Sequence, residues 1–387
     1  MGASPGPKFR GCKKSNYRQS HIMNQDRDAL NPKIDALKPK IGVIGGGQLG
    51  RIHAKLVAAN SSCEFVGVAD PSAESRQFIE SQLKAIATSD YREWSDTIDG
   101  AIIAAPTFLH HQIGSWCLSR GIHVLMEKPI ASTLEEASDL SQLAKSNNCT
   151  LQVGHVERFN PAWRCASTHI RNDTIRYIEA AREGTYTGRS TDIGIVMDLM
   201  IHDIDLILSV VNAPIDSVSA YGWSVLGETE DFATACLSFR NGTMVNLRAS
   251  RIAQVPKRSM QIYSDKGITD IDFASNSVSR TSALDDVADG SRRADQLPAD
   301  LRAKVKDNLF VDWLQRVEHK ALPANAIELE QKEFILAIRD GNPVTVTGEH
   351  GCQALAVASS ILDQIAINRP GRDIIPAASR FGRTKAA

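Results

Sequence analysis

The stretch Ile41-Gly-Val-Ile-Gly45-Gly46-Gly47-Gln48-Leu49-Gly50 decides the fold of this 387-residue chain. It reads as a short apolar strand, a glycine turn and the first turn of a helix. Gly45, Gly47 and Gly50 fit the dinucleotide-binding pattern: the first allows a tight turn, the second lets the backbone approach a pyrophosphate, and the third lets the helix pack on the strand. Free amides at the amino terminus of that helix would face the phosphates. The stretch therefore predicts a dinucleotide-binding domain.

A second strand, Glu64–Ala69, leads directly into Asp70, about twenty residues after the glycines, where a carboxylate would hold a ribose hydroxyl. Asp70 is followed by Pro71 and Ser72 rather than by an arginine. A carboxylate at this place repels a 2′-phosphate, so the sequence favours NAD over NADP. Arg76 lies close enough along the chain to weaken that preference.

Two later strands end in motifs that a bound dinucleotide could use. The strand at 100–103 leads into Ala105-Pro106-Thr107, and such a small-residue turn lets the backbone approach a flat cofactor. The strand at 121–126 delivers Glu127-Lys128-Pro129 at its carboxyl end, where ligands of open parallel sheets bind. Lys128 would therefore point toward the nicotinamide. Pro129 fixes the backbone there, and the bond that precedes it could be cis.

The apolar segment 194–208 predicts a helix that carries Asp198 and His202 four residues apart, on one face. Charged groups in so apolar a helix carry a desolvation cost unless they are partnered. One interpretation is a core histidine with a capping aspartate; the two upstream motifs favour a catalytic pair instead. No metal site is expected, because neighbouring acids on a helix point in different directions and two ligands are too few.

The bulk properties are typical of a soluble enzyme. The formal net charge of -1 predicts no strong field for nucleic acid or a membrane surface. No apolar run is long enough to span a bilayer. The seven cysteines are scattered without the short paired spacings of zinc or redox sites, so we expect reduced thiols. With no apolar core of a secretion signal near the start, these features predict a cytoplasmic protein.

The chain divides into segments of different character. We expect a disordered basic tail at 1–38 (or a start misassigned upstream of Met23), a Rossmann domain at 39–150, a sheet domain at 151–370 and a tail at 371–387. Beyond residue 214 the apolar pattern has period two, with hairpin turns at Asn241-Gly242 and Lys266-Gly267. Residues 281–325 are polar and predict an insertion, while the final helices could pack back on the Rossmann domain. An apolar outer sheet face would bind another copy, so we expect a homo-oligomer, a dimer or a tetramer.

Taken in order, these motifs resemble the Gfo/Idh/MocA (glucose-fructose oxidoreductase and inositol dehydrogenase) family over residues 39–370. The resemblance rests on the glycine fingerprint, Ala-Ala-Pro-Thr107 with His110, Glu-Lys-Pro, and Asp198-x-x-x-His202. It implies an α/β plus α+β protein, in which a Rossmann domain precedes an open, mostly antiparallel sheet, with substrate between them. It also implies that Lys128, Asp198 and His202 are catalytic. The cofactor contacts that we expect are Gly45, Gly47, Gln48, Leu49, Gly50, Asp70, Ala105, Pro106, Thr107, His110, Glu127 and Lys128.

A finer resemblance lies in the segment 153–161 and in Arg189-Ser-Thr-Asp192. Both are similar to the branch that oxidises nucleotide-linked amino sugars, in particular the 3-hydroxyl of UDP-N-acetylglucosamine, to supply a 3-keto sugar for amination before lipid A assembly. Arginine forks suit a diphosphate. The alternatives are exposed sheet arginines and a histidine that serves packing. The substrate-binding candidates are His155, Arg158, Asn160, Arg182 and Arg189.

The predicted reaction is oxidation of a ring hydroxyl by hydride transfer to NAD. His202 would remove the hydroxyl proton, Asp198 would share that proton or hold the imidazole, and Lys128 would donate a hydrogen bond to the reacting oxygen. The reverse assignment, with Lys128 as base and His202 as donor, stays open. A dehydrogenase of free inositol or hexose is an alternative. A non-catalytic dinucleotide-sensing regulator is another, against which the intact trio argues.

Overall fold

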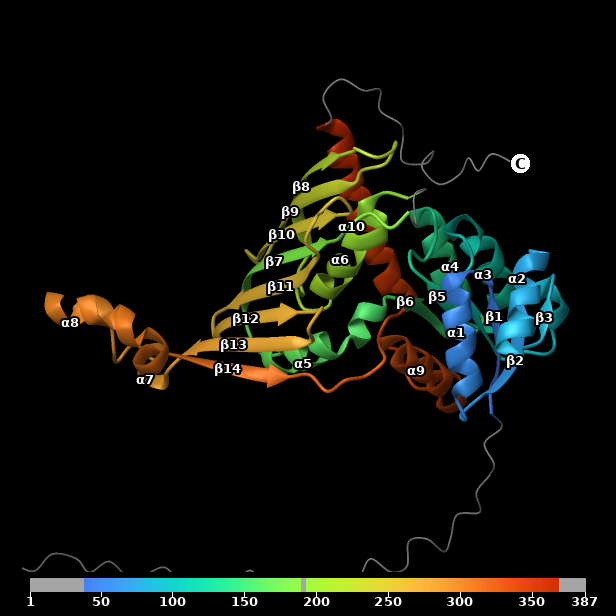
Figure 1. Cartoon of the computed structure of the whole chain (residues 1–387), viewed down its shortest axis with the longest axis horizontal. Coiled ribbons are helices and arrows are strands. Elements are labelled where there is room, and N and C mark those ends of the chain that lie inside the picture. Colours follow the sequence, from blue (N-terminus) through green and yellow to red (C-terminus); the bar gives the residue numbers. More distant parts are fainter. Residues whose placement is uncertain (1–37, 189–192, 369–387) are drawn as a thin grey trace, which may run out of the picture. The chain divides into compact units, whose positions relative to one another are not determined.

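The computed structural model describes residues 38–188 and 193–368. Two sheets organise this part of the chain, one of six strands and one of eight (Figure 1). The predicted tails at 1–38 and 371–387, apart from residue 38, lie outside the described residues, and so does Arg189. Within the described part, no helix has both the length and the apolar character needed to cross a membrane.

The first sheet is entirely parallel, with the strand order β3-β2-β1-β4-β5-β6. This order is that of a doubly wound dinucleotide-binding fold, which confirms the Rossmann prediction. Its central strands are apolar because helices cover both faces of a parallel sheet. The strands are β1 (Lys40–Ile44), β2 (Glu64–Ala69), β3 (Ala87–Thr88), β4 (Gly100–Ile103), β5 (His123–Glu127) and β6 (Leu151–Gly154). The helices are α1 (Gln48–Ala59), α2 (Ala73–Phe78), α3 (His110–Leu118) and α4 (Leu134–Ser146).

The last strand of this sheet lies beyond the predicted division of the chain at residue 150. β6 pairs in parallel with β5, with Gly154 opposite Glu127. The crossover between them is α4, which begins at a capping box formed by Thr133 and Glu136. A strand, a helix and a parallel strand make a βαβ unit, so the segment that we assigned to the second domain completes the first sheet.

The second sheet has the order β14-β13-β12-β11-β7-β10-β9-β8. All its neighbours are antiparallel except β7 and β10, which confirms the predicted, mostly antiparallel sheet. The predicted hairpin at Asn241-Gly242 joins β9 to β10, and Gly242 has the positive φ of 86° that the turn requires. The strands are β7 (Ile175–Glu183), β8 (Ile215–Trp223), β9 (Phe232–Phe239), β10 (Met244–Ser250), β11 (Lys257–Ser264), β12 (Gly267–Asp272), β13 (Ser277–Ala283) and β14 (Leu314–Lys320).

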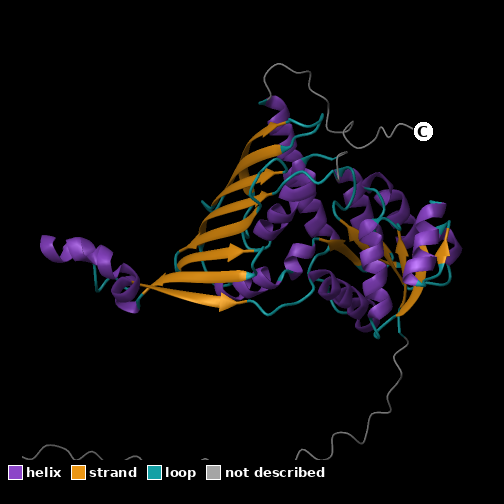
Figure 2. Cartoon of the chain, viewed as in Figure 1, coloured by secondary structure: helices purple, strands orange, loops and turns teal. Residues whose placement is uncertain are grey.

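Helices gather on one face of this second sheet, as Figure 2 shows. α10 contacts α4, α6 and β8 and so connects the two sheets, and α9 packs against α1 and β5 of the first. Buried side chains from both sheets consequently form one continuous apolar core. The helices that follow β6 are α5 (Pro161–Ile170), α6 (Ile201–Leu208), α9 (Ala326–Asp340) and α10 (Gly348–Ile367).

The opposite face of the second sheet carries exposed aromatic and apolar side chains. Tyr221 and Trp223 on β8 are 59% and 64% exposed, and Met244 on β10 is 41% exposed. Part of the predicted insertion at 281–325 is a helical arm between β13 and β14, which Figure 1 shows lying off the end of the sheet. The prediction was too long, because Leu314–Lys320 form β14 and pair with β13 inside the sheet. The two α-helices of the arm, α7 (Asp285–Ala288) and α8 (Ala299–Lys304), contain no buried residue.

Candidate active site

The glycine turn between β1 and α1 has space on the side where a pyrophosphate would lie. A Cβ atom on Gly45 would stand 2.5 Å from the carbonyl oxygen of Ala104, and one on Gly50 would stand 1.8 Å from that of Gly45. A Cβ atom on Gly47 would meet nothing within 4 Å. Gly47, Gln48 and Leu49 are exposed, and no side chain caps the amino terminus of α1. The turn therefore fits a dinucleotide, with two glycines required by the fold and Gly47 open on the side where a pyrophosphate would lie.

Asp70 lies beside this turn, as the sequence predicts. Its carboxylate accepts a hydrogen bond of 2.6 Å from the backbone amide of Gly46 and one of 2.8 Å from that of Ser72. The guanidinium of Arg76 donates to the backbone carbonyl oxygens of Asp70 and Pro71 at 2.9 and 2.8 Å. The carboxylate rather than the guanidinium consequently faces the glycine turn, which suits NAD.

His110 connects the two loops that end β4 and β5. Its Nδ1 lies 2.9 Å from the carbonyl oxygen of Pro129, and its Nε2 lies 2.9 Å from that of Ala105. Burial lowers the pKa of His110, and a neutral imidazole can donate to one of these two carbonyls. The predicted cofactor residue thus holds Ala105, Pro106 and Thr107 against the Lys128–Pro129 bond, which is cis.

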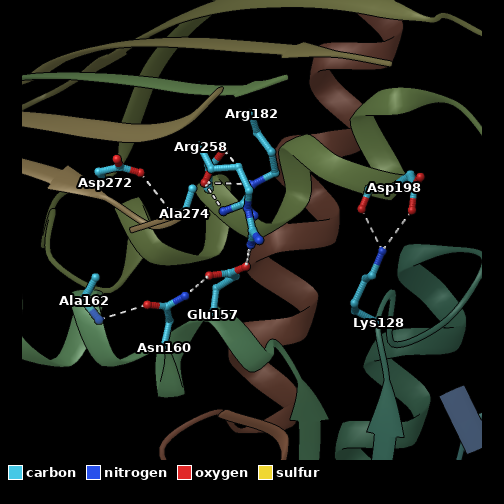
Figure 3. A network of polar contacts seen from close by, with 10 residues as sticks. Lys128, Glu157, Asn160, Ala162, Arg182, Asp198, Arg258, Asp272 and Ala274 are labelled. Carbon is cyan, nitrogen blue, oxygen red and sulfur yellow. Dashed lines mark hydrogen bonds and ion pairs between the residues drawn. The ribbon is translucent and has the colours of Figure 1, made fainter. Parts of the chain in front are cut away.

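Lys128 and Asp198 meet between the two sheets (Figure 3). The ammonium group of Lys128, at the end of β5, donates to the backbone carbonyl oxygen of Asp198 at 2.7 Å and lies 3.4 Å from its carboxylate Oδ1. Asp198 belongs to a π-helical turn, η5 (Val196–Met200), that runs into α6. Single π turns occur frequently at functional sites. Both partners of Lys128 are oxygen acceptors, which suit an ammonium donor.

His202, near the start of α6, is held in its neutral form. Burial lowers its pKa well below the ordinary value, and the charges of Lys128 and Arg182 lower it further. Its Nδ1 atom has no hydrogen-bond partner among the described residues. His155, after β6, is also buried, its pKa is lowered by burial, and neither ring nitrogen has a described partner. Both imidazoles therefore have a ring nitrogen available for a hydrogen bond to a ligand, and the neutral form is the one that a base requires.

Two predicted substrate arginines are paired inside the protein. Arg182 donates to both carboxylate oxygens of Asp203 at 2.7–3.2 Å. It also donates to Glu157 at 3.0 Å, and both of these residues are labelled in Figure 3. Arg158 donates to Asp205 at 2.6 and 3.0 Å, and these side chains are only 8% and 1% exposed. Breaking such a buried pair is strongly destabilising. The predicted contact of Arg158 and Arg182 with a diphosphate therefore finds no support in this geometry.

Asn160 also has an internal role. Its Oδ1 accepts from the amide of Ala162 at the start of α5, and its Nδ2 donates to Glu157 at 3.0 Å. Arg189 lies outside the described residues, so within the described part His155 is the substrate candidate with hydrogen-bonding groups to spare. No group of three His, Cys, Asp or Glu side chains in the described part is arranged to hold a metal ion.

The sequence analysis missed His53, which bonds to a predicted site residue. Glu127 was predicted to contact cofactor, but its carboxylate lies 2.8 Å from Nε2 of His53, a fully buried residue of α1. The available signal was a histidine three residues after Gly50, on a helix that packs against the parallel sheet.

The fold and site define an NAD-binding oxidoreductase, with an open glycine turn for the dinucleotide and a lysine and a neutral imidazole beyond the strand ends. The chain belongs to the Gfo/Idh/MocA family. Residues 39–155 match the family model described as "Oxidoreductase family, NAD-binding Rossmann fold", and residues 165–269 match the model of the GFO/IDH/MocA C-terminal domain.

Known proteins of this kind resemble the chain over most of its length. It is 32% identical over 325 residues to a UDP-N-acetylglucosamine 3-dehydrogenase of Acidithiobacillus ferrooxidans, which covers 83% of this chain and 96% of that protein. A solved structure of such an enzyme from the same organism has a TM-score of 0.73 at 29% identity and covers 84% and 97% of the two chains. A scyllo-inositol 2-dehydrogenase (NAD(+)) of Bacillus subtilis is 29% identical over 55% of this chain and 67% of that protein.

Replacing Gly47 with alanine should weaken NAD binding about tenfold, or about 1.4 kcal/mol, because the new methyl group occupies the side from which a pyrophosphate approaches. The thermal unfolding of the NAD-free protein should stay unchanged, since that methyl group meets no protein atom within 4 Å. Calorimetric titration with NAD measures the first effect, and a thermal melt measures the second. Gly227→Ala, also in open space but on the loop after β8, is the control. Equal NAD affinity in the two variants would contradict the assignment.

Proposed function

We propose that this protein is an NAD-dependent dehydrogenase that oxidises the 3-hydroxyl of UDP-N-acetylglucosamine to a ketone. The arrangement of Lys128 and Asp198 at 2.7 Å, with neutral His202 on the adjoining helix, carries the proposal. The 32% identity to a UDP-N-acetylglucosamine 3-dehydrogenase over most of the chain supports this choice of substrate.

The catalytic steps follow from the state of each side chain. Bound NAD supplies the hydride acceptor. Neutral His202 accepts the proton of the substrate hydroxyl as the carbon–hydrogen bond breaks. Lys128 donates a hydrogen bond to the same oxygen and stabilises its developing negative charge. Asp198 orients the ammonium group through its backbone carbonyl and its carboxylate.

Substrate recognition divides between the sugar and the diphosphate. His155, whose ring nitrogens lack described partners, is the proposed contact of a sugar hydroxyl or acetamido group. Arg189, outside the described residues, stays the proposed contact of the diphosphate. A dehydrogenase of a free inositol is the second candidate, and the internal pairing of Arg158 and Arg182 favours it, because that pairing removes two cations from the nucleotide.

The proposal also covers the oligomeric state and the cellular compartment. A second copy would cover Tyr221, Trp223 and Met244 on the open sheet face, giving a homo-oligomer, a dimer or a tetramer. The six described cysteines form no disulfide, which is typical of a reducing compartment. We therefore assign the protein to the cytoplasm, where its 3-keto product would be aminated for lipid A assembly.

His202→Ala should reduce the rate of NADH formation from NAD and UDP-N-acetylglucosamine by about two to four powers of ten, because the variant lacks the proton acceptor. Absorbance of NADH measures the rate, with a carbonyl trap to draw an uphill oxidation forward. NAD affinity should not change. Turnover of free inositols or hexoses without turnover of UDP-sugars would instead establish the second candidate.

The acid limb of the kcat/KM profile should lie below pH 6.5, the ordinary pKa of histidine, because burial first and Lys128 second lower the pKa of His202. Lys128→Met removes a positive charge, so the pKa of His202 rises and the limb moves to higher pH. Lys128→Arg keeps the charge and should leave the limb in place even though turnover slows. Loss of the acid limb in the methionine variant, rather than its move to higher pH, would favour Lys128 as the base.

Trp223→Glu should separate the proposed oligomer into smaller species, because a buried interface cannot hold an unpaired carboxylate without a large desolvation cost. Light scattering coupled to gel filtration measures the mass. Leu322→Glu is the matched control, since Leu322 is 85% exposed but follows β14 rather than lying on the sheet face. A wild-type protein that is already monomeric would contradict the proposed homo-oligomer.

A further inference from the structure

A buried chain of polar side chains lies behind the end of β5. Glu127, the last residue of β5, is 2.8 Å from Nε2 of His53 on α1. Nδ1 of His53 is in turn 2.7 Å from Nε2 of Gln331 on α9, a residue 278 positions away in sequence. All three side chains are buried. Three elements of the fold thus converge on the carboxylate that precedes Lys128.

The contacts of Gln331 determine where the proton of His53 lies. The Gln331 amide nitrogen also lies 3.3 Å from the backbone carbonyl oxygen of His53, which accepts a hydrogen bond from a nitrogen but not from an amide oxygen. The amide nitrogen must therefore face His53, and Nδ1 of the imidazole accepts from it. The imidazole proton then resides on Nε2, from which it is donated to Glu127.

This tautomer affects the protonation state of Glu127. The second carboxylate oxygen of Glu127 accepts the backbone amide of Lys128 at 3.2 Å. Burial alone would raise the pKa of Glu127, but the hydrogen bond from His53 and the charge of Lys128 lower it. If the proton moved to Nδ1, Nε2 would become an acceptor, and Glu127 would need a proton to bond to it.

The pKa of a neighbouring acid, Glu330, is shifted in the opposite direction to that of Glu127. Glu330 precedes Gln331 on α9, is fully buried, and has no described hydrogen-bond partner for either carboxylate oxygen. Burial and the charge of Glu127 raise its pKa well above the ordinary value. Glu330 is therefore neutral and Glu127 is ionised. The negative charge in this buried chain lies at the end of β5, directly beside Lys128.

We propose that Gln331 is a positioning residue for the oxidation proposed above: its amide fixes the His53 tautomer that keeps Glu127 ionised and bonded to the Lys128 backbone. Gln331 contacts neither substrate nor cofactor in this role. It acts through His53 and Glu127, and it affects turnover by fixing the orientation of Lys128. The expected effect on turnover rests on the proposed function, whereas the His53 tautomer does not depend on it.

The test uses Gln331→Met, which keeps the volume of the side chain and removes the donor. In the full-length protein with NAD bound, ¹⁵N–¹H correlation spectra of labelled histidine should place the His53 proton on Nε2. The variant should populate the Nδ1 tautomer. With whichever sugar the wild-type enzyme oxidises, kcat should fall about ten- to a hundredfold, as expected for a misplaced catalytic group, while the KM for NAD stays within about twofold.

Glu330→Gln is the matched control, because it lies one residue away on the same helix and is equally buried. It should leave both the tautomer and kcat unchanged. The proposal is overturned if the wild-type His53 proton is on Nδ1, if kcat falls in Gln331→Met without a change of tautomer, or if Glu330→Gln has the same effects. The tautomer needs no substrate, so a failed proposed function leaves it measurable and the two failures distinguishable.

Discussion

The pairing of buried charges on α6 is the constraint on which the site depends. This eight-residue helix buries Asp203 and Asp205, and each takes one arginine, Arg182 and Arg158 respectively. Removing charges from water is tolerated only where such pairing is complete. Burial lowers the pKa of His202 on the same helix, and the nearby cations Lys128 and Arg182 lower it further. The ion pairs therefore let α6 bury two acids, and the same burial keeps His202 in the neutral form that a base requires.

The last two helices allow residues from distant parts of the chain to act together. α10 packs on α4 of the first sheet and on β8 of the second, so one apolar core spans both. α9 brings Gln331 to α1 and β5. Side chains on such rigid elements are held more closely than those on loops. The hydrogen bond between Lys128 and Asp198 thus joins two parts that already share a core.

Features that depend on neighbouring residues could be predicted from the sequence, whereas partners brought together by the fold could not. The glycine turn, Asp70 and the hairpin at Asn241-Gly242 depend on residues adjacent in the chain, and each is found as predicted. The partners of Arg158 and Arg182 depend on which carboxylates the fold brings near, 47 and 21 positions away. The sequence pattern suggested diphosphate ligands because an arginine looks the same whether it faces solvent or a buried acid. The π turn that carries Asp198 likewise has no sequence signature.

The internal pairing of these arginines also limits how the proposed substrate can be recognised. A diphosphate needs cations or free amides, and two of the guanidinium groups closest to α6 already neutralise acids of the protein. In the proposed reaction, nucleotide recognition must then come from groups nearer the surface, while the sugar would meet Lys128, His202 and His155 in the interior. Change at the outer groups can alter the substrate without disturbing the buried pairs. Such a separation would allow relatives of one fold to act on different substrates, as the names of the relatives, a UDP-N-acetylglucosamine 3-dehydrogenase and a scyllo-inositol 2-dehydrogenase, indicate.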